Sequence, residues 1–446
     1  MQLFEGVTRK VFRMRVLWVC NIMLPMVAEK LHMESNVKEG WITGILSRLI
    51  KDGKNGEINL GIAFPANEGL AHFHDVYVFN EMPVECFGFY EDMGKLEQYQ
   101  PEIERRMEEI INQFQPDVIH VYGTEYPHAL AVARVCKNPE KLLVGIQGVI
   151  SIYAKGYLAD LPKDVYESAT FRDRLKKDSI LQQQEKYRKR GEMEIKTTRI
   201  AGNITGRTEF DKNFVLQTNE DAVYYPMNET MRPCFYEGAW SLEKCNKHQI
   251  FVSQADYPIK GFHYLLQAMP RILKEYPDTK VMVAGNNILR KGGPLNRIKV
   301  SAYAKYLEKL IEQNNLWDKI TFLGKISAEE MKKQYLECHA FLCPSVLENS
   351  PNSVAEAMLL GTPVIAARVG GIPSMITDRK EGLLYTGNDV DELADTVIEL
   401  WKDESVLPLS GRLAKAAVVR AHAAHDPETN FQRLKEIYRA INNKTK

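Results

Sequence analysis

The chain has 446 residues, which is too long for one ordinary hydrophobic core, and we expect two domains of roughly 200 residues each. Its hydrophobic content is 45% and its charged content is 26%, both of which are ordinary for a soluble globular protein. Fifty-eight basic residues balance fifty-eight acidic ones, so no overall field attracts nucleic acid, and we expect no nucleic-acid partner.

The N-terminal segment superficially resembles a signal peptide. Basic residues at positions 9, 10, 13 and 15 precede an apolar run over residues 16–28. Asn21 and Pro25 interrupt this run and no A-x-A cleavage pattern follows, so residues 15–20 are better interpreted as a first buried strand. The seven scattered cysteines favour a reducing compartment over a disulfide framework. We therefore expect a cytoplasmic protein without a membrane-spanning segment.

Short apolar runs alternate with amphipathic stretches along the whole chain, the pattern of βα units around parallel sheets. The first half has strand candidates at 16–20, 58–64, 76–79, 118–121, 142–146 and 222–225, with helical patterns such as 41–51 and 102–114. The second half has strand candidates at 250–253, 280–284, 320–323, 340–343 and 364–366, with helical patterns at 262–276, 302–313 and 328–337. Residues 226–248 show no periodicity and are interpreted as the connection between two sheets.

The most informative stretch begins at Glu348, after the apolar run 340–343. Ser350 is predicted to cap a helix whose first position is Pro351, and Gly361 suits the residue just beyond its end. Seven residues separate Glu348 from Glu356.

The amides of Asn352 and Ser353 would be free at the start of this helix and, with the helix dipole, would form an anion site. One carboxylate precedes the site and one lies within the helix. A diphosphate flanked by two hydroxyl-rich groups suits this arrangement, and a nucleotide sugar is such a molecule.

With these residues in view, the chain resembles the retaining glycosyltransferases of family four, which have the GT-B fold. The resemblance runs from residue 15 onward and depends on the order of several short motifs. These are G-W-I-T-G at 40–44, P-D-V-I-H-V-Y-G at 116–123, G-R-T at 206–208, K-G at 260–261, F-L-G-K at 322–325, E-x7-E at 348–356, G-G-I-P at 370–373 and E-G-L-L at 381–384.

The resemblance implies an α/β protein with two Rossmann-like parallel-sheet domains that face an interdomain cleft. Residues 1–228 would bind the acceptor and residues 229–427 the nucleotide sugar, while a C-terminal helix in residues 428–446 would cross back to the first domain. It also implies that Glu356 binds the ribose hydroxyls, that Glu348 lies beside the transferred sugar and that Lys260 contacts the diphosphate.

Further site residues follow from the same resemblance. The backbone of Gly324, Lys325 and Ile326 would contact the base, and Gly40 would permit close approach to phosphate, although a simple helix start explains Gly40 almost as well. Many relatives carry histidine where this chain has Gln147, which could still bond a sugar hydroxyl. Arg207 could bind acceptor or donor oxygen, and a structural ion pair is nearly as good an interpretation.

Two metal-like patterns have simpler explanations. Residues 389–391 spell D-x-D, but Glu392 follows Asp389 by three residues and a helix capping box explains the pair better. His72 and His74 have no third ligand at metal spacing and are interpreted as a surface turn. We expect no metal and no cofactor.

The stretch 172–199 carries ten basic and five acidic residues, a net charge of +5. A solvated helix face is the default interpretation. The functional interpretation is attraction to anionic lipid, which contributes about 1 kcal/mol of binding free energy per basic residue near the surface. Because lipid-linked acceptors are frequent in the family that the chain resembles, we keep a peripheral membrane contact as a hypothesis.

The sequence therefore predicts a metal-independent, retaining glycosyltransferase that moves a sugar from a nucleoside-diphosphate sugar to a carbohydrate or lipid-linked acceptor, in polysaccharide or glycolipid synthesis. A nucleotide-sugar epimerase, a phosphorylase or a non-catalytic nucleotide-sugar-binding subunit on the same fold stays open as an alternative.

Overall fold

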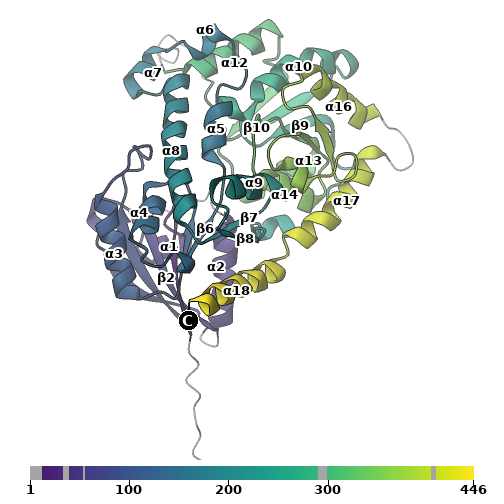
Figure 1. Cartoon of the computed structure of the whole chain (residues 1–446). Helices are drawn as coiled ribbons and strands as arrows, with labels where there is room; N and C mark the ends of the chain where they lie inside the picture. The colour runs from purple at the N-terminus through teal and green to yellow at the C-terminus, as the bar shows by residue number, and fades with distance from the viewer. Residues whose placement is uncertain (1–12, 34–39, 54–55, 290–298, 403–407, 446) are drawn as a thin grey trace, which may run out of the picture.

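A computed structural model describes residues 13–33, 40–53, 56–289, 299–402 and 408–445. In this part of the chain the strands form two sheets, one of eight strands and one of six. Figure 1 shows the two sheets in separate layers of helices, with the long helix α8 running alongside both.

The eight-stranded sheet has the order β3-β4-β2-β1-β5-β6-β7-β8, and only β3 runs antiparallel to its neighbour among the described strands. The strands are β1 Met14–Val19, β2 Ile58–Ala66, β3 His74–Phe79, β4 Met82–Tyr90, β5 Val118–Tyr122, β6 Leu142–Gly145, β7 Asn203–Gly206 and β8 Val223–Pro226. Its helices are α1 Pro25–Lys30, α2 Gly40–Asp52, α3 Glu102–Phe114, α4 Pro127–Val135, α5 Ile150–Gly156, α8 Ile180–Ile200 and α9 Glu209–Thr218.

The six-stranded sheet is parallel throughout and has the order β11-β10-β9-β12-β13-β14. The strands are β9 Asn246–Val252, β10 Lys280–Ala284, β11 Ile320–Gly324, β12 Cys338–Cys343, β13 Val364–Ala367 and β14 Leu383–Tyr385. Its helices are α10 Phe262–Glu275, α12 Ala302–Gln313, α13 Ala328–Glu337, α14 Asn352–Leu360, α15 Ile372–Met375, α16 Val390–Lys402 and α17 Leu409–Ala424. The strands β12, β13 and β14 are buried throughout, because helices cover both faces of a parallel sheet.

Two segments cross between the layers. Residues 157–180 leave the first layer after α5, and the short helices α6 Lys163–Tyr166 and α7 Phe171–Lys176 lie beside α12 (Figure 1). The carbonyl of Ala159 accepts hydrogen bonds from His263 (2.9 Å) and Tyr264 (3.0 Å), and Asp173 accepts one from the amide of Ala302 (2.9 Å). The segment therefore packs on the second sheet's helices.

The last helix, α18 Pro427–Lys444, follows α17 and packs along α2 (Figure 1). Its apolar face joins the core of the eight-stranded sheet, where the indole N–H of Trp18 donates to the Tyr438 hydroxyl at 2.8 Å. Asp426 caps the helix by accepting from the Thr429 amide at 2.7 Å, and Pro427 occupies the first helical position.

Candidate functional site

A cavity of about 680 Å³ opens at the carboxyl ends of the six-stranded sheet. The sheet order reverses between β9 and β12, and the cavity is lined by residues that follow each of these strands, such as Ser253 and Ser345. Parallel α/β sheets bind ligands at this kind of reversal point. The polar lining residues are Arg232, Ser253, Gln254, Lys260, Asn286, Lys325, Ser327, Ser345, Glu348, Asn352 and Ser353.

Lys260 and Glu348 meet at this cavity. Lys260 ends the 3₁₀ turn Pro258–Lys260, and Gly261 follows at φ +68°, where an added Cβ would lie 1.8 Å from the carbonyl oxygen of Pro344. Glycine therefore lets this turn approach the segment after β12. As a result the Lys260 ammonium donates to Glu348 Oε1 at 2.6 Å.

Glu348 is 7% exposed and also accepts from the Ser345 hydroxyl at 2.7 Å. Burial lowers the pKa of Lys260, but the charge of Glu348 and the neighbouring Tyr257 outweigh it and hold that pKa well above its usual value. Lys260 thus stays charged, and its ammonium has three hydrogens, of which Glu348 takes one.

The next helix, α14, starts one residue later than the sequence predicts. Its N-cap is Pro351, not Ser350, and no side chain caps it. The backbone favours this start because Pro351 has extended dihedral angles (φ −68°, ψ 124°) and its carbonyl accepts from the Val354 amide at 3.0 Å. Asn352 and Ser353 occupy the first two helical positions and line the cavity, so the uncapped start of α14 faces it.

Glu356 lies one turn further along α14 and is outside the cavity lining, with 5% exposure. Its Oε1 accepts from Arg232 Nη2 (2.7 Å) and Nε (3.2 Å), and its Oε2 accepts from the Tyr335 hydroxyl (3.3 Å). Burial raises the pKa of Glu356, and Arg232 and Tyr335 offset that rise only in part. Arg232, which the sequence analysis did not single out, lines the cavity in front of this carboxylate.

The predicted base-binding segment lies at the same cavity. Lys325 and Ile326 line it, and Gly324 ends β11 at φ +75° with open space where a Cβ would be. Ser327 follows and caps α13 through a capping box with Glu330.

The other predicted site residues lie outside this lining. Arg207 is ion-paired with Glu229 and donates to the Gln147 carbonyl at 2.8 Å, with 5% of its side chain exposed. Its contacts match the structural ion pair that the sequence left open. Gly40 is the first residue of α2, and Gly44 and other α2 residues line a second cavity of about 640 Å³. That cavity shares Arg232 and Ala328 with the first.

Asn349 joins the two sheets beside Glu348. Its amide nitrogen donates to Asp211 Oδ2 (3.0 Å) and the Gln147 carbonyl (3.3 Å), and its amide oxygen accepts from Thr208 (2.6 Å). The side chain is buried, so the position of Glu348 depends on contacts with the first layer.

The two metal-like patterns have other structural settings. Asp389 accepts from the Glu392 amide (2.8 Å), but Glu392 accepts from Thr386, so only half of the predicted capping box forms. His74 lies in β3, not in a turn before it. Within the described residues, no group of three or more potential ligand side chains could hold a metal ion. In the same part of the chain, none of the helices combines the length and apolar character needed to cross a bilayer.

Comparison with known proteins first defines the fold. The chain superposes on a sucrose-phosphate synthase of Thermosynechococcus elongatus with a TM-score of 0.64 and 15% identity, covering 96% of this chain and 99% of that one. It superposes on the Anabaena HepE protein in complex with UDP with a TM-score of 0.62 and 16% identity, covering 96% and 100%. With its two α/β layers, the protein has the GT-B fold of glycosyltransferases.

The sequence of the second layer has relatives of its own. Residues 240–419 match the model of the glycosyl transferases group 1. It is 32% identical to a D-inositol 3-phosphate glycosyltransferase of Corynebacterium urealyticum over 41% of each chain. It is 28% identical to a GDP-mannose-dependent alpha-(1-6)-phosphatidylinositol monomannoside mannosyltransferase of Mycolicibacterium smegmatis, over 40% of this chain and 44% of that one. The matched region thus spans about two fifths of each relative.

Proposed function

We propose that this protein is a retaining glycosyltransferase that transfers a sugar from a nucleoside-diphosphate sugar to an acceptor hydroxyl. The observation that carries the proposal is the pairing of Lys260 with Glu348 beside the uncapped start of α14, in a cavity at the carboxyl ends of the second sheet. One of the relatives is named as GDP-mannose-dependent and one of the structural neighbours was solved with UDP, which supports this donor class.

In this proposal the diphosphate lies between the Lys260 ammonium and the amides of Asn352 and Ser353. These groups carry positive charge where negative charge develops as the sugar leaves, so they stabilise the transition state more than the ground state. Lys260 has hydrogens for both Glu348 and a phosphate oxygen, so the ion pair need not break when donor binds.

Glu348 would lie beside the sugar, accept its hydroxyls and stabilise the positive charge of an oxocarbenium-like transition state. Attack from the face that the diphosphate leaves would retain the configuration and let a phosphate oxygen take the acceptor proton. No strong protein base is needed in that route, which agrees with Gln147 in place of histidine. The acceptor, a carbohydrate or a lipid-linked sugar, would bind against the first layer.

A screen of UDP-, GDP- and ADP-sugars by thermal shift and calorimetry tests the donor class. We expect one nucleotide to raise the melting temperature and its sugar form to transfer to an acceptor extract, with the anomeric configuration retained by NMR. Failure of all nucleotide sugars to bind would refute the proposal. Conversion of the donor to an epimer without acceptor would favour the epimerase, and binding without transfer would favour the non-catalytic subunit.

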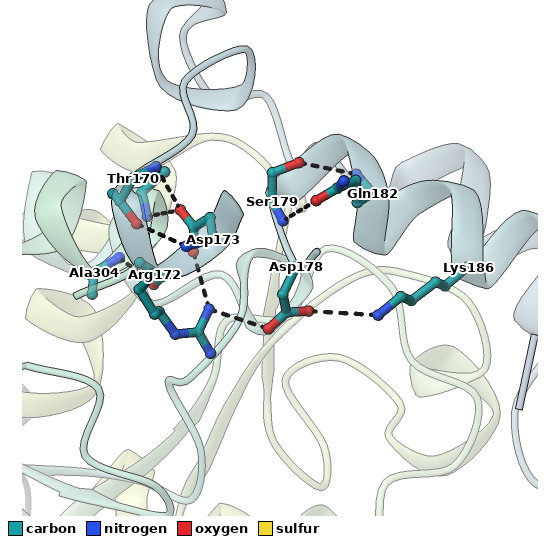
Figure 2. Close-up of polar contacts among 10 residues, drawn as sticks. Thr170, Arg172, Asp173, Asp178, Ser179, Gln182, Lys186 and Ala304 are labelled. Atoms are coloured by element: carbon teal, nitrogen blue, oxygen red, sulfur yellow. Dashed lines mark hydrogen bonds and ion pairs between the residues drawn. The ribbon is translucent and has the colours of Figure 1, made fainter. Parts of the chain in front are cut away.

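We also propose a peripheral membrane contact through α7 and the start of α8. Figure 2 shows that two of the basic side chains in this stretch already form ion pairs within the protein: Arg172 pairs with Asp173 and Asp178, and Lys186 pairs with Asp178. Phe171 and Leu175, four residues apart on one face of α7, are 67% and 75% exposed. Arg174, Lys176 and Lys177 are exposed beside them, so apolar and basic groups lie together.

Co-sedimentation with phosphatidylcholine vesicles, with and without phosphatidylglycerol, tests this contact. We expect binding only to the anionic vesicles and a loss of it in Leu175→Ser, but not in Leu216→Ser, a control at another exposed leucine (50% exposed). Binding that ignores lipid charge, or equal loss in both variants, would refute it.

A further inference from the structure

We propose that the second cavity, of about 640 Å³ beside α2, binds a small organic anion that has an apolar ring. The inference goes beyond the proposed function, because it places a ligand where the transfer of the sugar needs none. It also stands without that function, since its test uses no nucleotide sugar.

Elements of both layers and of the connection between them form this cavity. One face of α2 is the first wall, residues of the stretch 230–236 are the second, and the start of α13 is the third. Pro25 and Pro427, the first residues of α1 and α18, also line it. Ligand sites are typically cavities of about 300–1,000 Å³ and are frequent at contacts between domains, so the size and the place both suit a ligand.

Much of the lining is apolar. Pro25, Pro233 and Pro427 present rigid rings from three different segments of the chain. Met231 and Cys234 add sulfur-containing side chains from the connection between the sheets. Because methionine adapts its shape and its sulfur makes favourable contacts with aromatic rings, an aromatic ring suits this part of the cavity.

Two polar side chains of α2 are available to a ligand. Ser47 and Lys51 are four residues apart, so they lie on the same face of the helix, and both are exposed and line the cavity. Among the described residues, neither side chain has a hydrogen-bond or ion-pair partner. A hydroxyl and an ammonium on one helix face can both donate to the oxygens of a carboxylate, sulfonate or phosphate.

The neighbouring charges identify Lys51 as the group that would bind the anion. Arg48, which also lines the cavity, already donates to Glu428 at 2.7 Å and to Asp52 at 3.0 Å. Glu329 is the acidic residue of the described lining, and it lies on α13, not on α2. The anionic group of the ligand therefore belongs at α2, with its ring against the prolines and the connection.

This site is separate from the cavity that is proposed to bind the donor. Its described lining contains neither Lys260 nor Glu348, and no residue of α14. Among their described lining residues, the two cavities have only Arg232 and Ala328 in common. A ligand held by α2 would therefore bridge the first layer and the start of α13 without occupying the place proposed for the diphosphate and the sugar.

Anilinonaphthalene sulfonate, an aromatic ring system with one anionic group, is the probe, and phenylnaphthylamine is its neutral counterpart. Cys234 reports on occupancy because it lines the cavity and is the one cysteine of the seven that is not buried. At a saturating concentration, the sulfonate should slow the alkylation of Cys234 by iodoacetamide about tenfold, as followed by mass spectrometry. In fluorescence titrations, the neutral compound should bind about tenfold more weakly than the sulfonate.

Variants of the full chain place the probe. Lys51→Glu should weaken binding of the sulfonate about tenfold and leave the neutral compound unchanged, because it reverses the charge at an exposed position. Ser47→Trp, which fills the cavity from the same helix face, should weaken both compounds. Lys305→Glu, at an exposed lysine of α12 outside the lining, is the matched control and should change neither. Lys260→Gln, in the first cavity, should also change neither.

Unchanged alkylation of Cys234 at saturation, or equal losses for the two compounds in Lys51→Glu, would overturn the proposal. A loss in Lys260→Gln as large as that in Lys51→Glu would overturn it too, because the probe would then bind in the first cavity.

Discussion

If the cavity binds a nucleotide sugar as proposed, single residues there should affect binding of the diphosphate and transfer of the sugar differently. The Lys260–Glu348 pair is mostly buried, and each partner's charge is compensated by the other. Removing one partner of such a pair leaves an uncompensated charge, and here the remaining charge is the ammonium that would face a diphosphate.

Glu348→Gln should therefore separate turnover from nucleotide binding. We expect kcat for transfer to fall about 100-fold, since the charge beside the sugar is lost, while the nucleoside diphosphate binds at least as tightly because Lys260 is no longer shared. Steady-state kinetics and calorimetry measure the two effects, with Glu337→Gln, at the last residue of α13 and outside the cavity lining, as the control. Equal losses in kcat and in diphosphate affinity would contradict the role given to Glu348.

Among the elements, α14 is proposed to bind the diphosphate through its backbone amides, and a substitution can remove one of these amides alone. Asn352→Pro deletes the N–H at the first helical position, where proline is well tolerated and where the preceding residue already has an extended conformation. We expect diphosphate affinity to fall about five- to tenfold relative to Asn352→Ala, which keeps the amide, with nearly unchanged melting temperatures. Equal affinities for the two variants would show that this amide does not contact the ligand.

Glu194, which accepts from the first amides of α5, should make the stability of the protein depend on pH. Glu194 of α8 is fully buried and accepts from the amides of Ile150 (3.0 Å) and Ser151 (2.8 Å) and from the Thr124 hydroxyl (3.0 Å). Burial raises the pKa of Glu194 to about 7, although the bonds from Ser151 and Ile150 oppose the rise.

Between the ordinary carboxyl pKa and about 7, the folded state holds a proton that the unfolded state has released. The free energy of unfolding should therefore fall as pH rises through this window, by about 3 kcal/mol from this group, and level off above it. Urea unfolding at a series of pH values should show this slope in the wild type and a flatter one in Glu194→Gln. Parallel curves for the two proteins would contradict the raised pKa.

The accuracy of sequence-based prediction differed between kinds of element. Strands that are buried along their whole length, such as β12 and β13, were located to within two residues, because burial on both faces of a parallel sheet requires a continuous apolar run. The strands β4, β7 and β14 were missed: β4 contains Pro83 and Gly88, and β7 is four residues with a polar first position. Their pairing with neighbouring strands overrides weak local preference.

The residues of the candidate site also differ in whether a local sequence pattern marks them. Lys260, Glu348 and the start of α14 could be located from the sequence because they stand in a recognisable spacing. Arg232 lies in an irregular connection, and its link to the candidate site is its contact with Glu356, 124 residues away. The predicted cap at Ser350 failed because Pro351 takes the cap conformation itself. Contacts across such distances leave no local pattern.

In the whole molecule, α18 closes the core of the eight-stranded sheet although it follows the second layer in sequence. Its Tyr438 hydroxyl accepts from the Trp18 indole at 2.8 Å and lies 2.7 Å from His120 Nδ1. Burial lowers the pKa of His120 to about 3, so its ring is neutral and can accept the phenolic hydrogen. One hydroxyl thus connects β1, β5 and α18.

Tyr438→Phe should test how far this crossing stabilises the molecule. The variant keeps the ring but leaves the Trp18 N–H and the His120 nitrogen buried without their partner, so the free energy of unfolding should fall by about 2–4 kcal/mol. Tyr385→Phe is a matched control, because among the described residues the buried Tyr385 hydroxyl has no hydrogen-bond partner and its removal should cost almost nothing. Urea unfolding followed by tryptophan fluorescence measures both. If the two variants lose the same stability, the loss comes from removing a buried hydroxyl and not from the contact between α18 and the first sheet.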